Sequence, residues 1–209
     1  HLDKVLEYPN NKYSEDAMLM GAEMAYTAKD YEKALHIYKQ LKDKAASMER
    51  RQLAKTGMLR SAHMLGNEEE IIFAATDLLA DTKLAPELSN EAHYYRAKAY
   101  LDAGKTDGAM EDLKILAKDT RNVYGAEAKY KVAQIYFDGG QTDKAEQEVL
   151  NYIEVSTPHT YWLARSFVLL ADVYMKLGRN LDAKQYLLSL KQNYQADDDI
   201  AGMIESRLE

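Results

Sequence analysis

A short sequence pattern returns along this chain at an almost constant interval of 36–38 residues. In its clearest form the pattern is Ala-x-x-Tyr, then a glycine four residues later, then an alanine five residues after the glycine. Two units near the N-terminus follow it more loosely. The last position of the pattern is held in the five units by Ala34, Ile71, Ala109, Ala145 and Ala183. A fixed period of this size is typical of repeat proteins, in which each unit buries its apolar side against its neighbours.

Each unit has the pattern of two helices joined by a tight turn. Before the glycine, apolar residues stand three and four positions apart, as in Val132, Ile135 and Tyr136. We expect the glycine, or the residue in its place, to adopt the left-handed conformation that ends a helix. We expect N-terminal caps on the second helices at Asp30, Asn67, Thr106, Thr142 and Asn180, with Glu70 completing a capping box. The recurring small residues predict close contact between helix backbones, because a larger side chain would hold them apart.

The prolines and the chain ends agree with this division. Pro9, Pro86 and Pro158 fall between one unit and the next, where proline is tolerated. Residues 1–9 have the pattern of the tail of a second helix, so we expect the array to continue upstream. The first residue is His1 rather than methionine, and we therefore expect a fragment of a larger protein. Residues 197–209 predict a last helix, which is either a cap or the start of a truncated repeat.

Composition and motifs argue against several classes of function. The net charge is −7 with no basic stripe, which disfavours nucleic acid as a partner. The chain has no cysteine, and no apolar run approaches the roughly 20 residues of a membrane span. The segment Gly104-Lys105-Thr106 imitates a phosphate-binding loop, but Ala99 stands where that motif needs glycine. No two histidines stand three or four residues apart, and neither Ser61 nor Ser166 has a nucleophile elbow. We therefore expect no enzyme activity, no cofactor and no metal site.

The segment Leu170-Ala171-x-x-Tyr174-x-x-x-Gly178-x-x-x-x-Ala183 resembles the tetratricopeptide repeat (TPR). The resemblance covers nearly the whole chain, although the period exceeds that family's usual 34 residues. It implies an all-α fold, a right-handed superhelical solenoid of about five helix–turn–helix repeats followed by a C-terminal helix. The implied boundaries are residues 1–9 for the tail of a preceding repeat, 15–46, 48–82, 86–119, 122–156 and 159–194 for the repeats, and 197–209 for the last helix.

In that family the first helices line a concave groove, at the second, fifth, ninth and twelfth positions of each unit. Mapped here, the groove residues are Tyr26, Arg60, His63, Tyr94, Lys98, Tyr130, Gln134, Phe137 and Asp172. Aromatic rings among charged and amide side chains suit a peptide or a partner helix. We favour Tyr94 and Tyr130, which lie well round the helix from the tyrosines expected in the core. For Tyr26 and Phe137, packing against neighbouring helices is an equally good interpretation.

The resemblance implies a non-catalytic scaffold that binds a protein or peptide. The alternative is a regulatory or sensor module of a signalling or transcription protein, and a carbohydrate-binding module or enzyme has less support. The segment Tyr161–Tyr174 is similar to repeats of long bacterial cell-envelope TPR proteins and of periplasmic lipoproteins of outer-membrane assembly. It implies a periplasmic or outer-membrane-associated location, and otherwise a cytoplasmic one. The partner's identity and the oligomeric state stay open.

Overall fold

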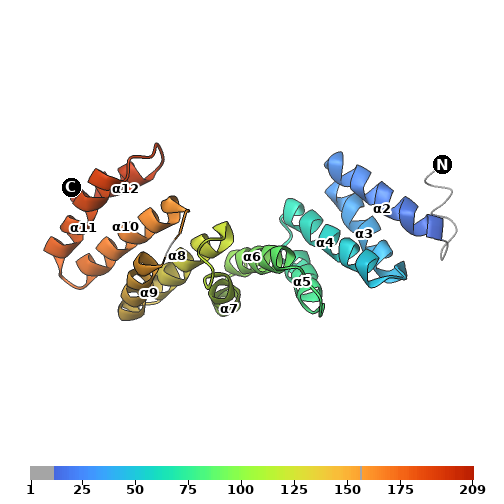
Figure 1. Ribbon diagram of the computed structural model, residues 1–209, viewed down its shortest axis with the longest axis horizontal. Coiled ribbons are helices and arrows are strands. Elements are labelled where there is room, and N and C mark those ends of the chain that lie inside the picture. Colours follow the sequence, from blue (N-terminus) through green and yellow to red (C-terminus); the bar gives the residue numbers. More distant parts are fainter. Residues whose placement is uncertain (1–11, 156) are drawn as a thin grey trace. The chain divides into compact units, whose positions relative to one another are not determined.

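The computed structural model describes residues 12–155 and 157–209, and its regular elements in these ranges are helices. The expected helix tail at residues 1–9 lies outside the described residues. The helices are α2 (Lys12–Thr27), α3 (Tyr31–Lys44), α4 (Met48–Leu65), α5 (Glu68–Leu79), α6 (Pro86–Asp102), α7 (Thr106–Leu116), α8 (Val123–Asp138), α9 (Thr142–Glu154), α10 (Thr160–Lys176), α11 (Asn180–Asn193) and α12 (Ile200–Leu208). The prediction of an all-α chain of helix–turn–helix units is confirmed, and Figure 1 shows the antiparallel pairs.

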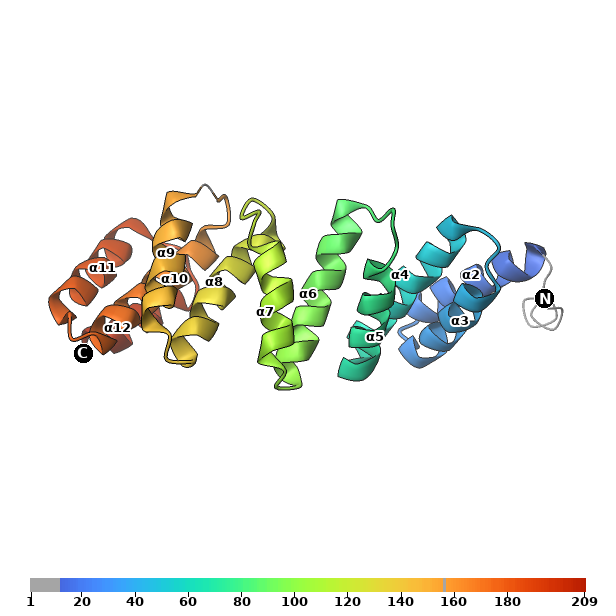
Figure 2. The same cartoon turned by 90° about the horizontal axis from the view of Figure 1, so that it is seen from below.

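The chain divides into two compact units, residues 1–109 and residues 110–209. Unit 1 contains the pairs α2–α3 and α4–α5, followed by α6, and each helix packs on the next one along the chain. Unit 2 contains the pairs α8–α9 and α10–α11, with α12 packed on both α10 and α11. Figure 2 shows α8, α9 and α10 side by side within unit 2. In both units the second helix of one pair therefore packs against the first helix of the next.

The turn inside each helix pair has the same conformation in all five repeats. The turn residue lies in the left-handed region, with φ between 63° and 77°, in Lys29, Gly66, Gly104, Gly140 and Gly178. In each turn the following N–H donates to a carbonyl five residues back, as Gln141 does to Tyr136 at 2.8 Å. The predicted left-handed conformation at the end of each first helix is confirmed, including at Lys29, which replaces glycine in the first repeat.

The predicted N-terminal caps are correct for two of the five second helices. The side chain of Asp30 accepts from the N–H of Lys33, and that of Asn67 accepts from the N–H of Glu70, both at 3.2 Å. The capping box is only half formed, because the Glu70 carboxylate accepts from Lys39 Nζ at 2.6 Å instead. The remaining three predictions are wrong, because the helices already begin at the named residues, which are Thr106, Thr142 and Asn180.

Each unit has its own hydrophobic core, built from the facing sides of its helices. The core of unit 1 combines small residues such as Ala22, Ala54 and Ala92 with larger ones such as Met58 and Leu78. The core of unit 2 includes Leu169, Leu170 and Leu187, and the α12 residues Ile200 and Ile204 complete it. The five marker positions are all buried, as expected for Ala34, Ile71, Ala109, Ala145 and Ala183.

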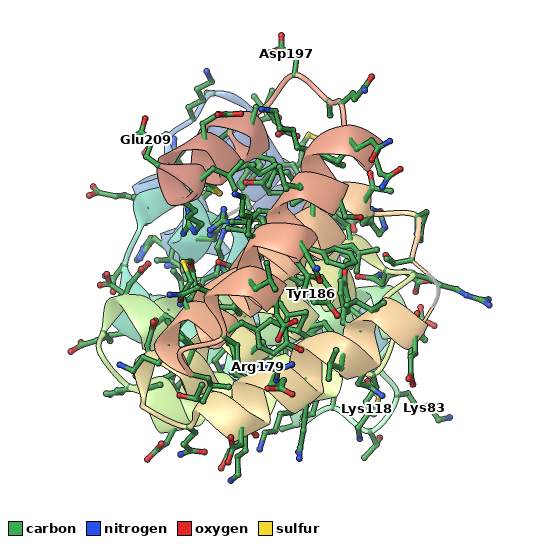
Figure 3. All side chains as sticks on the ribbon, turned by 90° about the vertical axis from the view of Figure 1, so that its left-hand side faces the viewer. Lys83, Lys118, Arg179, Tyr186, Asp197 and Glu209 are labelled. Atoms are coloured by element: carbon green, nitrogen blue, oxygen red, sulfur yellow. The ribbon has the colours of Figure 1, made fainter. Side chains whose placement is uncertain are left out.

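Figure 3 views unit 2 from its C-terminal end. Tyr186 points among the helices, in agreement with its packing against the core, whereas Asp197 lies at the outer tip of the loop before α12. The large apolar residues of α12 all face the core, because Met203 and Leu208 pack against it beside the buried Ile200 and Ile204. The last helix is therefore an integral part of unit 2.

Two helical glycines mark places where the chain approaches itself too closely for any side chain. A Cβ atom on Gly57 of α4 would overlap the ring of Tyr38 on α3. A Cβ atom on Gly125, in the first turn of α8, would overlap the carbonyl oxygens of Asp119 and Leu116. A ring can rotate away from such a contact at moderate cost, but a backbone carbonyl can move only if the loop before α8 moves with it.

Replacing Lys29 with glycine should stabilise the protein, because a left-handed L-residue costs roughly 1–2 kcal/mol. Part of this gain, roughly 0.5–1 kcal/mol, is lost to the greater freedom of glycine in the unfolded chain. We expect Lys29→Gly to raise the free energy of unfolding by up to about 1 kcal/mol in urea denaturation followed by circular dichroism. The control, Gly104→Ala at the equivalent turn position, should change it in the opposite direction. Equal signs for the two variants would contradict this account.

Replacing Gly125 with alanine should destabilise unit 2 by about 1–3 kcal/mol, because the added methyl group meets backbone rather than a flexible side chain. Gly202 in α12 is the matched control, since a Cβ atom there meets nothing within 4 Å. Gly202→Ala should instead stabilise the protein by up to about 1 kcal/mol through helix propensity. Thermal unfolding of both variants measures the difference, and a stable Gly125→Ala protein would show that the loop yields easily.

Candidate functional site

The nine predicted site residues all lie on the first helix of a pair. In unit 1 they come from α2, α4 and α6, and in unit 2 from α8 and α10. We use the term first-helix face for the surface formed by these residues and the side chains bound to them, taken separately in each unit. Their placement by unit is as follows: Tyr26, Arg60, His63, Tyr94 and Lys98 belong to unit 1, and Tyr130, Gln134, Phe137 and Asp172 belong to unit 2.

In unit 1 an ion pair joins the first helices α4 and α6. The Nε and Nη2 atoms of Arg60 donate to the two carboxylate oxygens of Glu91 at 2.8 and 3.0 Å. This hydrogen-bonded pairing raises the pKa of the Arg60 guanidinium. The forked geometry fixes the direction of both side chains, which a single-point contact would not do.

Beside this ion pair the His63 ring stacks on Tyr95, with ring centroids 4.0 Å apart and an interplanar angle of 14°. Tyr94 lies next to Tyr95, at 6.0 Å between centroids, and the Lys98 ammonium sits 4.8 Å from the centre of the Tyr94 ring. Burial and the positive charge of Lys98 lower the pKa of His63, whereas Glu91 acts in the opposite direction. His63 is therefore held in its neutral form more strongly than a free histidine.

Tyr26 lies at the edge of this face. Its ring is half-buried, packs against the core of unit 1, and makes an edge-to-face contact with Tyr31 at 5.2 Å between centroids. The interpretation of Tyr26 as a ring packed on neighbouring helices therefore accounts for these contacts. In unit 2, Phe137 is likewise half-buried and packed against the core.

In unit 2 the first-helix face centres on a network of tyrosines and Arg165. The Arg165 guanidinium donates to the hydroxyl of Tyr130 at 2.9 Å and to that of Tyr161 at 3.0 Å, and it lies 4.8 Å from the centre of the Tyr130 ring. The Tyr130 hydroxyl donates to Gln134 at 2.8 Å. The Tyr161 hydroxyl faces both carboxylate oxygens of Asp199 at 2.9 and 3.2 Å. This network joins α8, α10 and the loop before α12.

The expectation that Tyr130 lies away from the core is wrong for its ring. The residue is only 6% exposed and belongs to the core of unit 2, where its ring packs 5.6 Å from that of Trp162. Burial also raises the pKa of the Tyr130 hydroxyl. The Tyr130 ring lies between α8 and α10, and its hydroxyl group takes part in the network. Tyr94, in contrast, is half-buried.

Asp172 links the first helix α10 to the last helix, α12. Both of its carboxylate oxygens accept from Arg207 of α12, at 2.7 and 3.0 Å, and this pairing raises the pKa of Arg207. Sequence reasoning missed Arg207, because the register of α12 in the repeat was open. It also missed Glu91 and Arg165, although each stands six residues before the alanine of its Ala-x-x-Tyr motif, at the second position of its repeat, which is the first of the four groove positions. Applying the mapping rule to every unit would have found these two.

Three cavities are lined by second-helix residues together with residues of first helices and loops. One of about 630 Å³ lies on α5 beside Phe73, which is 56% exposed. Two others of about 340 Å³ lie near Lys129, between α7, α8 and α9, and near Tyr186, between α10 and α11. None of these three is lined by a predicted site residue. The first-helix face carries ordered side chains, which are suited to contact with an extended partner.

The described residues were also compared with the requirements of metal sites and of membrane-spanning helices. In residues 12–155 and 157–209 there is no group of three or more His, Asp or Glu side chains placed to hold a metal ion. Within the same ranges, none of the helices combines the length and the apolar character needed to cross a bilayer.

Comparison with known proteins places the fold. Residues 91–119 and residues 164–192 each match a tetratricopeptide repeat family model. The crystal structure of MamA protein is similar with a TM-score of 0.65 and 16% sequence identity, over 87% of this chain and 96% of that one. The nearly identical TPR-like repeats assigned to a kinesin light chain of Podosopora anserina are similar with a TM-score of 0.57 and 18% identity, over 85% and 93%. No curated protein matches the chain.

The chain therefore has the fold of the tetratricopeptide repeat class, and two of its segments match that family in sequence. Repeats of this class are generally protein–protein interaction modules, and the fold is usually non-catalytic. At these identities the likeness to solved structures shows the fold alone. The residues of the first-helix face have to be argued from this chain itself.

The lowered pKa of His63 predicts a pH-dependent stability. Below the ordinary histidine value of 6.5 the unfolded chain takes up a proton that folded His63 resists, so stability present at higher pH is lost as the pH falls. Replacing His63 with phenylalanine keeps a ring against Tyr95 and removes the titration. Urea denaturation at about pH 7.5 and about pH 5.5 should therefore show a smaller loss for His63→Phe than for wild type. An equal loss in both proteins would assign the pH dependence to other groups.

Proposed function

We propose that this chain is a non-catalytic scaffold, part of a larger protein, that binds an extended peptide or a helix of a partner protein across the first-helix face. The partner would lie over α4 and α6 in unit 1, or over α8 and α10 in unit 2. The observation that carries this proposal is the fixed arrangement of aromatic and charged side chains on these helices, held by hydrogen bonds between one first helix and the next and between α10 and α12.

Ordered side chains matter because binding otherwise costs the entropy of fixing them, about 0.5–1.5 kcal/mol for each flexible side chain. On this face Arg60 and Arg165 are already held before any partner arrives. Tyrosine, tryptophan and arginine are also the residue types that dominate binding energy at protein interfaces. Tyr94, Tyr95 and Trp162 provide such rings, each half-buried and so able to contact a partner while resting on its own unit.

The same contacts support a non-catalytic role. The polar groups of the first-helix face are engaged in pairs that join helices, such as Arg60 with Glu91 and Asp172 with Arg207. Catalysis by acid and base groups needs a nucleophile and a base oriented toward one another and toward a substrate atom. The His63 ring stacks on Tyr95, which positions it for packing against a partner. A location in the cell envelope is a further proposal, supported only by the resemblance of residues 161–174.

Selection of random 12-residue peptides by phage display on the full chain tests this function. Peptides that bind should lose affinity when Tyr94 is replaced by alanine or Lys98 by glutamine, or when Gln134 is replaced by alanine in unit 2. Loss of a central interface residue costs about 2 kcal/mol or more, which is roughly a thirtyfold weaker Kd in calorimetry.

The matched control is Leu181→Gln on α11, which changes a 71% exposed apolar residue on a second helix. Affinity should not change in this variant, and melting temperatures show whether each protein is folded. Peptides that lose binding on Leu181→Gln or Phe73→Ser, and keep it in all the first-helix variants, would move the site to the second helices. Failure to select any binding peptide would count against peptide recognition altogether.

A further inference from the structure

A cavity lined by lysines lies in unit 2, outside the first-helix face. Its volume is about 340 Å³, and its walls come from α7, α8, α9 and the adjoining loops. The charged side chains in its lining are those of Lys114, Lys118, Lys129 and Glu148. Because the whole chain carries a net charge of −7, this excess of positive charge is a local feature. The cavity is therefore a candidate site for an anion.

Of the three lysines in the lining, Lys129 has an acidic partner. Its Nζ atom lies 2.7 Å from the Glu148 carboxylate and donates to the Asn151 amide oxygen at 2.7 Å. Lys114 and Lys118 are exposed, and Figure 3 shows Lys118 at the periphery of unit 2. Neither of these two forms an ion pair within residues 12–155 and 157–209. Two positive charges of the cavity are thus not neutralised by the described chain.

A fourth lysine adds to the positive charge next to the cavity. The ammonium groups of Lys114 and Lys144 lie 5.7 and 5.6 Å from the centre of the same ring, that of Tyr136. In the part of the chain that the structure describes, Lys144 also has no acidic partner. Like charges placed near one another repel, and an anion bound between them would offset this repulsion.

The corresponding place in unit 1, between α3, α4 and α5, has a different balance of charge. Counted from the buried marker residues, Lys39 and Lys55 of unit 1 match Lys114 and Lys129 of unit 2. Both lysines of unit 1 form ion pairs at 2.6 Å, Lys39 with a carboxylate of α5 and Lys55 with a carboxylate just after it. The same helix packing therefore occurs with its lysines neutralised.

The acidic residues of the unit 1 site have no acidic counterparts in unit 2. The matched positions are Glu70 with Lys144, Asp77 with Asn151, Asp81 with Val155, and Asp43 with Lys118. Two acids are thus replaced by neutral residues and two by lysines. The dipole of α7 favours lysines near its C-terminal end, but it does not account for the loss of acids along α9. The charge of this site therefore differs from what the packing of the helices requires.

A smaller side chain also leaves space in the unit 2 cavity. Ala117 in its lining matches Lys42 of unit 1, whose ammonium reaches Asp77 at 3.1 Å. With Val132 and Val155, Ala117 gives the cavity an apolar wall beside its lysines. A volume of about 340 Å³ lies at the lower end of the range for small-molecule sites, which is roughly 300–1,000 Å³. The cavity thus has room for an organic group next to an anionic one.

We propose that this cavity binds a phosphate monoester. A phosphate ester carries a charge of about −1.5 to −2 at pH 7, so it neutralises both Lys114 and Lys118, whereas one carboxylate neutralises a single lysine. Lysine binds phosphate as a compact point charge with three donors and does not need the planar geometry of a carboxylate. The apolar wall is the part of the site that receives the organic group. This inference goes beyond the proposed function, since it concerns a different surface.

Titration of the full chain with phenyl phosphate, followed by NMR, tests the proposal. We expect saturable shifts of the methyl signals of Ala117, Val132 and Val155, which line the cavity. Benzoate has the same ring and only one charge, and it should bind about tenfold more weakly or worse. A phosphoserine peptide distinguishes the source of the ester. Tighter binding than phenyl phosphate assigns it to a side chain of a partner protein, and weaker binding assigns it to a small molecule.

Two variants give unit 2 the residues of unit 1. Asn151→Asp and Lys118→Asp introduce the carboxylates that the matched positions of unit 1 already accommodate, so the protein should stay folded, which melting temperatures check. Each should weaken the binding of phenyl phosphate by about tenfold or more, because the new carboxylate competes for the lysines and repels the ester. The matched control is Lys184→Glu on α11, outside the lining, which changes the net charge as much as Lys118→Asp and should leave the Kd almost unchanged.

Three results would overturn the proposal. The first is the absence of saturable shifts at the three methyl groups of the cavity wall. The second is equal affinity for benzoate and phenyl phosphate, since the site would then not select phosphate. The third is an equal loss of affinity in Lys184→Glu and Lys118→Asp, because net charge alone would explain it. Each of these results leaves the proposed function standing, since the first-helix face is not involved.

Discussion

Close packing of one helix against the next is the interaction on which the rest of this structure depends. The helices are 9–18 residues long, a length at which an isolated helix is marginally stable in water. Each therefore needs a neighbour to cover its apolar side, and small residues at the contact let the backbones approach. Ala34, Ala109 and Ala145 are fully buried at equivalent positions, and Gly57 leaves room for the ring of Tyr38. The left-handed turn then returns the chain so that the next helix meets the previous one.

The helix pairs were predictable because a repeat presents the same evidence several times. One glycine in a helical pattern is ambiguous, but four glycines and Lys29 at matched positions all adopt φ between 63° and 77°. To predict an N-terminal cap, the first residue of the helix must be known to within one residue, and the sequence pattern does not locate it that accurately. Thr142 and Asn180 have cap-forming side chains, yet the helices begin one residue earlier than expected, with Gln141 and Arg179 at the N-cap and no side-chain cap bond. The cap preference of one residue therefore does not fix where a helix starts.

The sequence predicted which helices carry the candidate site residues, but not which side chains those residues contact. All nine predicted residues lie on first helices, because the family pattern carries the helix and its face. What each side chain does depends on its neighbour in the next repeat, some 31–38 residues away in sequence. Tyr130 shows the limit of helical spacing, since Trp162 and Arg165 of the next first helix cover its ring and reduce its exposure to 6%. A single helix viewed alone offers no sign of this contact.

The first-helix face has to join successive repeats and to remain free for a partner, and these two demands conflict. Exposed ion pairs add only about 0–1 kcal/mol, so the fork of Arg60 with Glu91 contributes more to the direction of the side chains than to stability. A face whose charges were all paired in this way would hold its repeats in register, but it would have no unpaired charge with which to bind a charged partner. At Arg165 the two demands are met by different atoms. The tyrosine hydroxyls hold the guanidinium between α8 and α10, and within residues 12–155 and 157–209 the group forms no ion pair. Joining repeats through neutral acceptors thus keeps a cation ordered without an ion pair.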